Sequence, residues 1–266
     1  MDRRPIGVMD SGLGGLSVLR VLHDELPQES LTFVGDQGHF PYGTKSQQTI
    51  RQLSLAIGRF LVAHDVKLMV IACNTATGAA LTTLQRELPI PVIGVIQPGA
   101  AAALATPVQT VGVIGTTSTI KNGAYVKALH DLQPSVKVVS QPAQPLVSIV
   151  EHGQTGTPMA QRAVNATLAI FDDQPIETLV LGCTHFPFLR AEIQQKVGPN
   201  VRLVDPAVET VQAVKRKLAA CDLLAPVDNT DQQVTLYSTG QKADLMRGAD
   251  QWLAGQYDTC QHVDLV

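Results

Sequence analysis

Two cysteines occur in similar sequence settings in two parts of the chain. Cys73 ends the segment KLMVIAC and Cys183 ends the segment ETLVLGC, so each thiol follows an apolar run typical of a buried strand. No C-x-x-C pair is present, and Cys183 and His185 have no second Cys/His cluster at zinc-finger spacing. The sequence therefore argues against a redox disulfide and a structural metal site, and we expect no bound metal.

A pair of thiols is suited to inverting a carbon that carries an acidic hydrogen. A thiolate on one face removes the proton and a thiol on the other face delivers one, with the roles exchanged in the reverse reaction. A free cysteine has a pKa of about 8.5, which a helix N-terminus or a cation lowers, so thiolate and thiol can coexist near neutral pH. Taken singly, each cysteine is most simply inert core. As a pair followed by polar groups, Cys73 and Cys183 favour catalysis.

Small polar residues next to the same apolar segments offer hydrogen-bond donors for a ligand carboxylate. They are Ser11, Asn74, Thr75 and Thr184, and the alternative role for each is to cap the following helix. Asp10 could cap a helix, hold a substrate ammonium or transfer a proton. Asp36, Glu151 and His185 could tune a thiol or relay its proton. For Asp36 and Glu151 taken alone, a solvated loop is the simpler interpretation.

Apolar β-branched segments alternate with helical patterns, which is typical of α/β proteins with mostly parallel sheets. Four segments recur in order: residues 5–12 resemble 110–117, 26–36 resemble 132–141, 67–75 resemble 177–185, and 93–104 resemble 201–211. The recurrence predicts two similar, pseudo-symmetric α/β domains whose sheets are flanked by helices. Because ligands bind beyond the carboxyl ends of parallel strands, we expect the polar residues and thiols in a cleft between the domains.

The sequence after about residue 221 contains a further strand and a further helix. QQVTLYSTG is predicted to be a strand, and KADLMRGADQWLAG is predicted to be an amphipathic helix that carries the only Trp. We expect this C-terminal part to complete one of the two halves.

The composition excludes several classes of function. The chain has 266 residues, of which 45% are hydrophobic and 16% charged, and its net charge is −3 with no basic block. Nucleic acid is therefore not expected as a primary partner. No secretory signal or membrane span is predicted, so we expect a cytoplasmic protein. The segment GLGGLS at 12–17 is an incomplete dinucleotide motif and no P-loop is present, so no cofactor is expected.

Several motifs together resemble the glutamate racemase family: IGVMDSGLGGLSVL, PYG at 41–43, IACNTATGAAL, GVIQPGA, VGVIGTTSTI and LGCTHFPFL. The resemblance runs from residue 6 to about residue 210. It implies a cofactor-independent enzyme that interconverts L- and D-glutamate and supplies D-glutamate for peptidoglycan. It also implies a homodimer and two domains, residues 1–97 with 208–266 and residues 98–207, with the active site between them.

The resemblance implies roles for individual residues. The implied catalytic thiols are those of Cys73 and Cys183, assisted by Asp10, Asp36, Glu151 and His185. The implied substrate-binding residues are Asp10, Ser11, Tyr42, Gly43, Asn74, Thr75, Thr184 and His185.

Two alternatives accompany this interpretation: an aspartate racemase-like enzyme of the same superfamily, and a non-catalytic regulator that binds a small molecule with this fold. Aspartate racemase-like relatives tend to have Glu after the second Cys-Thr, where this chain has His185, so glutamate is favoured. The retained pair of thiols argues against the regulator.

Overall fold

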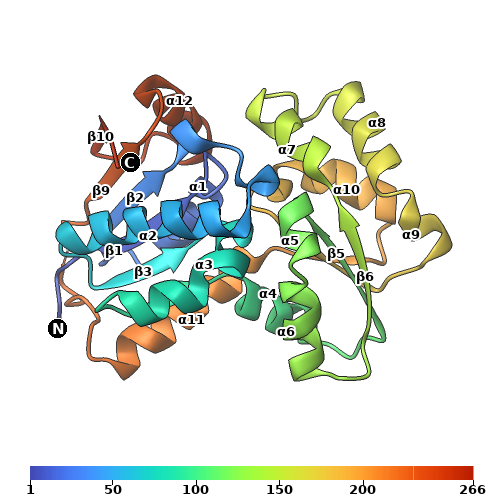
Figure 1. Cartoon of the computed structure of the whole chain (residues 1–266), viewed down its shortest axis with the longest axis horizontal. Helices are drawn as coiled ribbons and strands as arrows, with labels where there is room; N and C mark the ends of the chain where they lie inside the picture. Colours follow the sequence, from blue (N-terminus) through green and yellow to red (C-terminus); the bar gives the residue numbers. More distant parts are fainter. Residues whose placement is uncertain (230, 266) are drawn as a thin grey trace.

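The computed structural model describes residues 1–229 and 231–265, and their strands form two parallel sheets (Figure 1). The first sheet has the order β10-β9-β2-β1-β3-β4, with β1 Ile6–Asp10, β2 Leu31–Gly35, β3 Leu68–Ile71, β4 Val92–Gly94, β9 Val234–Ser238 and β10 Thr259–His262. The second has the order β6-β5-β7-β8, with β5 Thr110–Gly115, β6 Lys137–Pro142, β7 Thr178–Gly182 and β8 Arg202–Val204. We call each sheet with its helices the first half and the second half, and Figure 1 shows them side by side.

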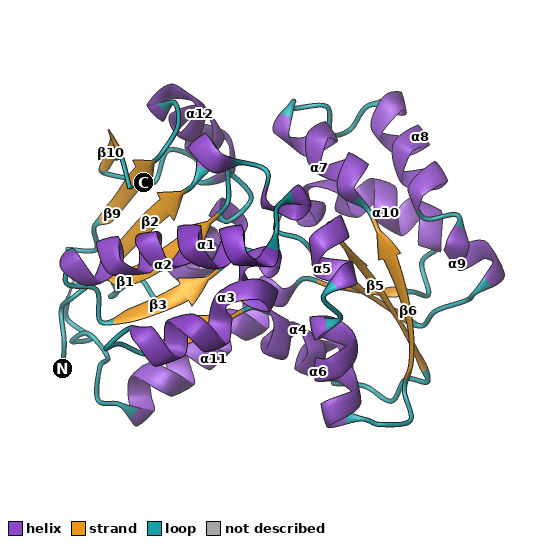
Figure 2. Cartoon of the chain, viewed as in Figure 1, coloured by secondary structure: helices purple, strands orange, loops and turns teal. Residues whose placement is uncertain are grey.

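Helices cover both faces of each sheet (Figure 2). In the first half, α1 (Leu16–Glu25), α11 (Pro206–Ala220) and α12 (Lys242–Trp252) cover one face, and α2 (Gln47–Ala63) and α3 (Asn74–Glu87) cover the other. In the second half, α7 (Gln144–Glu151), α8 (Pro158–Thr167) and α10 (Arg190–Val197) pack opposite α4 (Ile96–Ala103) and α6 (Ala124–Leu132). The shorter helices are α5 (Thr117–Lys121), α9 (Ile170–Asp173) and the 3₁₀ turns η1 (Gln37–His39), η2 (Tyr42–Thr44) and η3 (Phe186–Leu189).

The central strands are buried on both faces, which explains their continuous apolar sequences. On β1, Val8 packs with the helices of one face and the next residue, Met9, packs with the helices of the other. Successive side chains of a strand point to opposite faces, so a run without polar residues satisfies both layers. Each such side chain stabilises the fold by about 1.5–3 kcal/mol when it is removed from water.

The chain enters the second half through α4 and returns through α11, and these two helices pack against each other. Strands β9 and β10 then join the first sheet beside β2. The predicted C-terminal strand and helix are therefore confirmed as β9 and α12. Trp252 of α12 stacks on Phe188 of the second half, with ring centroids 4.1 Å apart.

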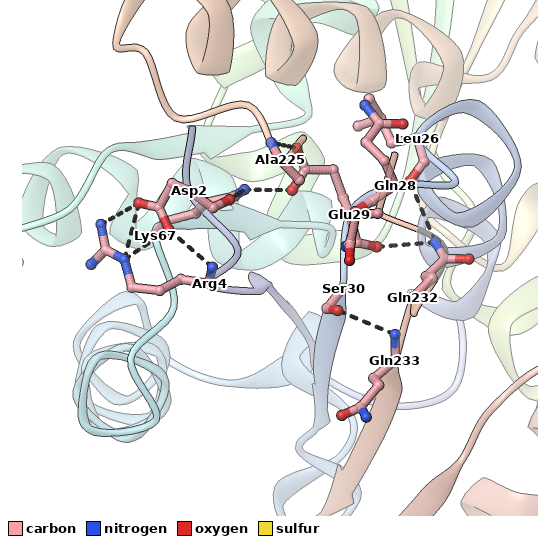
Figure 3. A network of polar contacts seen from close by, with 11 residues as sticks. Asp2, Arg4, Leu26, Gln28, Glu29, Ser30, Lys67, Ala225, Gln232 and Gln233 are labelled. Atoms are coloured by element: carbon pink, nitrogen blue, oxygen red, sulfur yellow. Dashed lines mark hydrogen bonds and ion pairs between the residues drawn. The ribbon is translucent and has the colours of Figure 1, made fainter. Parts of the chain in front are cut away.

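A buried ion pair, Lys67 with Glu29, lies just before the starts of β3 and β2 (Figure 3). Lys67 Nζ lies 2.5 Å from Glu29 Oε2, and neither side chain is exposed. Lys67 also donates to the Asp2 carbonyl oxygen at 2.6 Å, and Glu29 Oε1 accepts from the Ala225 amide at 2.8 Å. The pair therefore joins the N-terminal segment, the starts of β2 and β3, and the segment after α11.

The predicted α/β fold with two helix-flanked parallel sheets is confirmed by these elements. The strands after residue 207 belong to the first sheet, and the division of the chain into two domains stays a prediction. Within residues 1–229 and 231–265, no helix has the length and apolar character needed to cross a membrane.

Candidate active site

The two thiols lie at the carboxyl ends of corresponding strands and line one cavity between the halves. Cys73 comes two residues after β3 and Cys183 directly follows β7. Their residues are 5% and 7% exposed, so both thiols are almost fully enclosed. The cavity is small. The volume that the centre of a water molecule can reach inside it is about 10 Å³, which is room for about one water.

Cys73 is held in its protonated form by its surroundings. It caps α3, and its Sγ accepts from the Ala76 amide at 3.4 Å and donates to Ser11 Oγ at 3.6 Å. Burial, reinforced by the negative charge of Asp10, raises the pKa of Cys73 to about 12. The helix N-terminus that favours a thiolate in the sequence is thus outweighed by desolvation.

Cys183 begins a chain of three polar groups in the second half. Its Sγ lies 3.5 Å from His185 Nδ1, and His185 Nε2 lies 2.5 Å from Glu151 Oε1. Burial by itself lowers the pKa of His185. The hydrogen bond and negative charge of Cys183, and then the hydrogen bond and negative charge of Glu151, raise this pKa by more than burial lowers it. The pKa of His185 is raised well above its ordinary value, so the structure favours an imidazolium between a sulfur and a carboxylate.

Asp10 connects the two halves from the end of β1. Its Oδ1 accepts from the Gly12 amide at 2.9 Å and its Oδ2 accepts from Thr184 Oγ1 at 3.2 Å. Burial raises the pKa of Asp10, while the positive charge of His185 and these two hydrogen bonds oppose the rise. Asp10 therefore acts near both thiols, through its charge on Cys73 and through its hydrogen bond to Thr184, the residue after Cys183.

Further hydrogen bonds join the halves around the cavity. Thr75 Oγ1 lies 2.9 Å from Thr116 Oγ1 and 3.0 Å from Thr119 Oγ1. The hydroxyl of Tyr125 donates to Asn74 Oδ1 at 2.6 Å. Residues at the start of α3 thus contact residues that follow β5, and the polar groups near both strand ends are brought together.

Asp36 is buried and hydrogen-bonded to its neighbours. It is 1% exposed, so the solvated-loop interpretation is wrong for this residue. Tyr42 donates its hydroxyl to Asp36 Oδ2, and Thr239 Oγ1 from the C-terminal part donates to Asp36 Oδ1 at 2.6 Å. Tyr42 and Gly43 line the cavity, whereas Asp36 lies behind Tyr42.

Glu151 is likewise held in a defined contact, since its bond to His185 fixes it at the end of α7 with a side chain 18% exposed. The simple solvated-loop interpretation is therefore wrong for Glu151 as well.

The cavity also contains residues that the sequence analysis did not select. They are Phe40, Pro41, Gln144 and Val147. Thr116 also lines the cavity, and it follows β5 as Cys183 follows β7, which agrees with its place after an apolar run in the sequence. Gln144 and Val147 lie on α7, and no local pattern marks them. Among the residues that the structure describes, no group of three or more His, Cys, Asp or Glu side chains is arranged to hold a metal ion.

Comparison with known proteins agrees with this geometry. Residues 6–214 match the protein family described as Asp/Glu/Hydantoin racemase, which covers most of the chain. The chain belongs to this family.

Within the family, the chain is similar over its full length to glutamate racemases. The chain is 62% identical over 265 residues to the glutamate racemase of Limosilactobacillus reuteri (strain DSM 20016), covering 100% of this chain and 98% of that protein. The crystal structure of glutamate racemase isoform RacE1 from Bacillus anthracis is 37% identical, with a TM-score of 0.95 and coverage of 100% and 99%. That of Francisella tularensis subsp. tularensis SCHU S4, in complex with D-glutamate, is 33% identical, with a TM-score of 0.93 and the same coverage. The predicted membership of the glutamate racemase family is confirmed.

Proposed function

We propose that this protein interconverts L- and D-glutamate without a cofactor, and that Cys73 and Cys183 are its two acid–base groups. The observation that carries the proposal is that two buried thiols, from corresponding strand ends of the two halves, line the same cavity. Full-length similarity to glutamate racemases supports glutamate over aspartate as the substrate and an enzyme over a regulator.

In one direction, the thiolate of Cys183 takes the proton from the α-carbon of glutamate. The electron pair stays on the carbon and its carboxylate, and the thiol of Cys73 delivers its proton to the opposite face. The reaction leaves the thiol on Cys183 and the thiolate on Cys73, and the reverse reaction starts from this state. No net proton or electron is consumed, so no co-reactant is required.

The two thiols differ in the charged groups that surround them. The imidazolium of His185, 3.5 Å from Cys183 Sγ, stabilises negative charge on that sulfur. The pKa of Cys73, raised to about 12 by burial, keeps that group as the thiol at neutral pH. Cys73 is therefore the proton donor in the direction written above.

The other cavity groups are suited to binding an amino acid with two carboxylates. The hydroxyls and amides that donate to carboxylates are those of Ser11, Tyr42, Gly43, Asn74, Thr75 and Thr184. Asp10 does not itself line the cavity, but it bonds to the cavity residue Thr184 and is the carboxylate assigned to the substrate ammonium, and His185 carries positive charge beside Cys183. Asp36 acts as a positioning residue through its bond to Tyr42.

Glutamate is larger than the space between the thiols, so we infer that the two halves part to admit it. We further propose that the D-glutamate product serves peptidoglycan synthesis in the cytoplasm and that the enzyme is a homodimer, as the family resemblance implies.

Replacement of each thiol tests the mechanism. The wild-type protein in D₂O, without cofactors, should racemise glutamate and replace its α-hydrogen by deuterium, as measured by circular dichroism and proton NMR. Cys73→Ala and Cys183→Ala should each lose racemisation by at least about 1,000-fold, because a two-base reaction needs both groups. Cys221→Ala, at an exposed cysteine, is the matched control and should be fully active. Full activity in either active-site variant would refute the two-base assignment.

A further inference from the structure

Gln144 places an unpaired amide at the cavity that contains the two thiols. It is the first residue of α7, the helix that ends at Glu151, and it lines the cavity together with Cys73 and Cys183. Its Oε1 is buried and has no hydrogen-bond partner among the residues that the structure describes. A buried polar atom of this kind is destabilising unless a partner reaches it.

The amide lies across the cavity against the backbone of the first half. A Cβ added to Gly43 would lie 2.2 Å from Gln144 Oε1 and 2.8 Å from Thr116 Cβ. Glycine at position 43 therefore leaves room for the Gln144 amide and for Thr116 beside the turn η2. The Gln144 amide is thus fixed at the contact between the halves.

The neighbouring hydroxyls do not supply the missing partner. Thr116 Oγ1 lies 2.9 Å from both Thr75 Oγ1 and Thr119 Oγ1, so these three hydroxyls bond to one another. Among the described residues no group bonds to Gln144 Oε1, so the amide is free to bond to a ligand that enters the cavity.

The charges around the cavity indicate which part of the ligand the amide meets. Gln144 lies beside Gly43 and Thr116, where the surrounding polar groups are hydroxyls. The carboxylates of Asp10 and Glu151 lie with Thr184 and His185. An ammonium group is favoured beside the carboxylates, so a carboxylate of the substrate is favoured beside Gln144.

We propose that Gln144 is a further substrate-binding residue, whose side-chain amide donates a hydrogen bond to a carboxylate of glutamate. This inference rests on the proposed glutamate substrate. A half-turn of the terminal amide exchanges Oε1 and Nε2, so the donor can occupy the position next to Gly43. The contact reaches a carboxylate and not the reacting carbon, so it acts on binding and on specificity.

Variants of Gln144 test the proposal through the separation of KM from kcat. Gln144→Leu keeps the approximate size of the side chain but loses the donor, and KM for glutamate should rise about 10-fold with kcat changed by less than about threefold. Gln144→Glu brings a like charge to the carboxylate, and KM should rise further, by roughly 100-fold. The dissociation constant of D-glutamate, measured by calorimetry, should change in parallel with KM.

The control is Gln141→Leu, at a nearby glutamine whose side chain donates to the Pro142 carbonyl, and both KM and kcat should be unchanged. If Gln144→Leu lowers the melting temperature but leaves KM and the dissociation constant unchanged, the residue only packs and the proposal is wrong. Tighter binding by Gln144→Glu would assign the amide to the ammonium instead, which also overturns it. If Gln144→Leu does not fold, Gln144→Asn, which withdraws the amide by one methylene, should give the same rise in KM.

Failure of the proposed function has a different signature from failure of this inference. If the proposed function fails, the wild-type protein itself does not racemise glutamate. Calorimetry of D-glutamate binding to the wild type and to Gln144→Leu still decides whether the amide binds the ligand's carboxylate.

Discussion

Replacement of Glu151 by glutamine tests the electrostatic asymmetry of the two thiols. Glu151 Oε1 lies 2.5 Å from His185 Nε2, with side chains 18% and 2% exposed, so the carboxylate acts on the imidazolium with little screening by water. The Glu151→Gln variant keeps the shape of the side chain and removes its charge. The imidazolium loses one of the two groups that raise its pKa, and Cys183 remains as the other.

The size of the effect follows from the hydrogen bond that is lost. A hydrogen bond to a charged group is worth about 1.5–3 kcal/mol, and one pKa unit corresponds to about 1.4 kcal/mol. The imidazolium should therefore lose about 1.5–3 kcal/mol of stabilisation in Glu151→Gln, and the pKa of His185 should fall. A group with a raised pKa is charged below that pKa and loses its charge as the pH rises through it. The alkaline fall in kcat/KM should accordingly begin at a lower pH in the variant.

The assay is a pH profile of kcat/KM in both directions, followed by circular dichroism. Because the equilibrium constant of a racemisation is one, kcat/KM should fall equally for L- and D-glutamate, by about 10- to 100-fold on the alkaline side of the profile. The control is Glu192→Gln, which removes another carboxylate of the second half that accepts from the Gly156 amide at 2.6 Å outside the cavity. It should leave the pH profile unchanged. An identical alkaline limb in wild type and Glu151→Gln would contradict the proposed role of His185.

Three further predictions concern other parts of the structure. Burial raises the pKa of Asp10, so the protein loses stability as the pH rises through that pKa and the buried carboxylate ionises. Asp10→Asn should therefore raise the melting temperature at pH 7 by about 2–5 °C. The same variant should lower kcat/KM about 100-fold. Lys67→Met leaves Glu29 buried without its cationic partner and should lower the melting temperature by about 10 °C. The activity of the folded protein should be unchanged. A melting temperature equal to that of the wild type in calorimetry would disprove the stabilising role of the ion pair. Gly43→Ala introduces a Cβ 2.2 Å from Gln144 Oε1, so kcat/KM should fall at least about 10-fold, and wild-type kinetics would show that the halves need not approach so closely.

The sequence was sufficient for the elements and for the two thiols because both depend on local patterns. Continuous apolar runs predict strands covered on both faces, and β3 and β7 are such strands. A residue that follows a parallel strand lies at the carboxyl edge whatever the packing of the rest, so Cys73 and Cys183 could be assigned to one edge of each sheet. The recurrence of the segments added that the two edges correspond.

The contacts between distant segments could not be read from the chain. Asp36 is in a polar segment that resembles a solvated loop, but Tyr42 and Thr239 bury it, and Thr239 is distant in the sequence. Gln144 was not selected, because only the approach of α7 to Gly43 brings its amide to the cavity.

The sequence by itself therefore determined the fold class, the family motifs and the pair of groups able to move a proton. The tertiary structure alone decided the surroundings of each thiol. A helix start after Cys73 suggests a lowered pKa, yet burial raises the pKa to about 12, whereas Cys183 lies against an imidazolium that Glu151 helps to charge. Desolvation and the distance to a charge depend on all the segments that pack around a group, and neither is a property of the residues next to it in the chain.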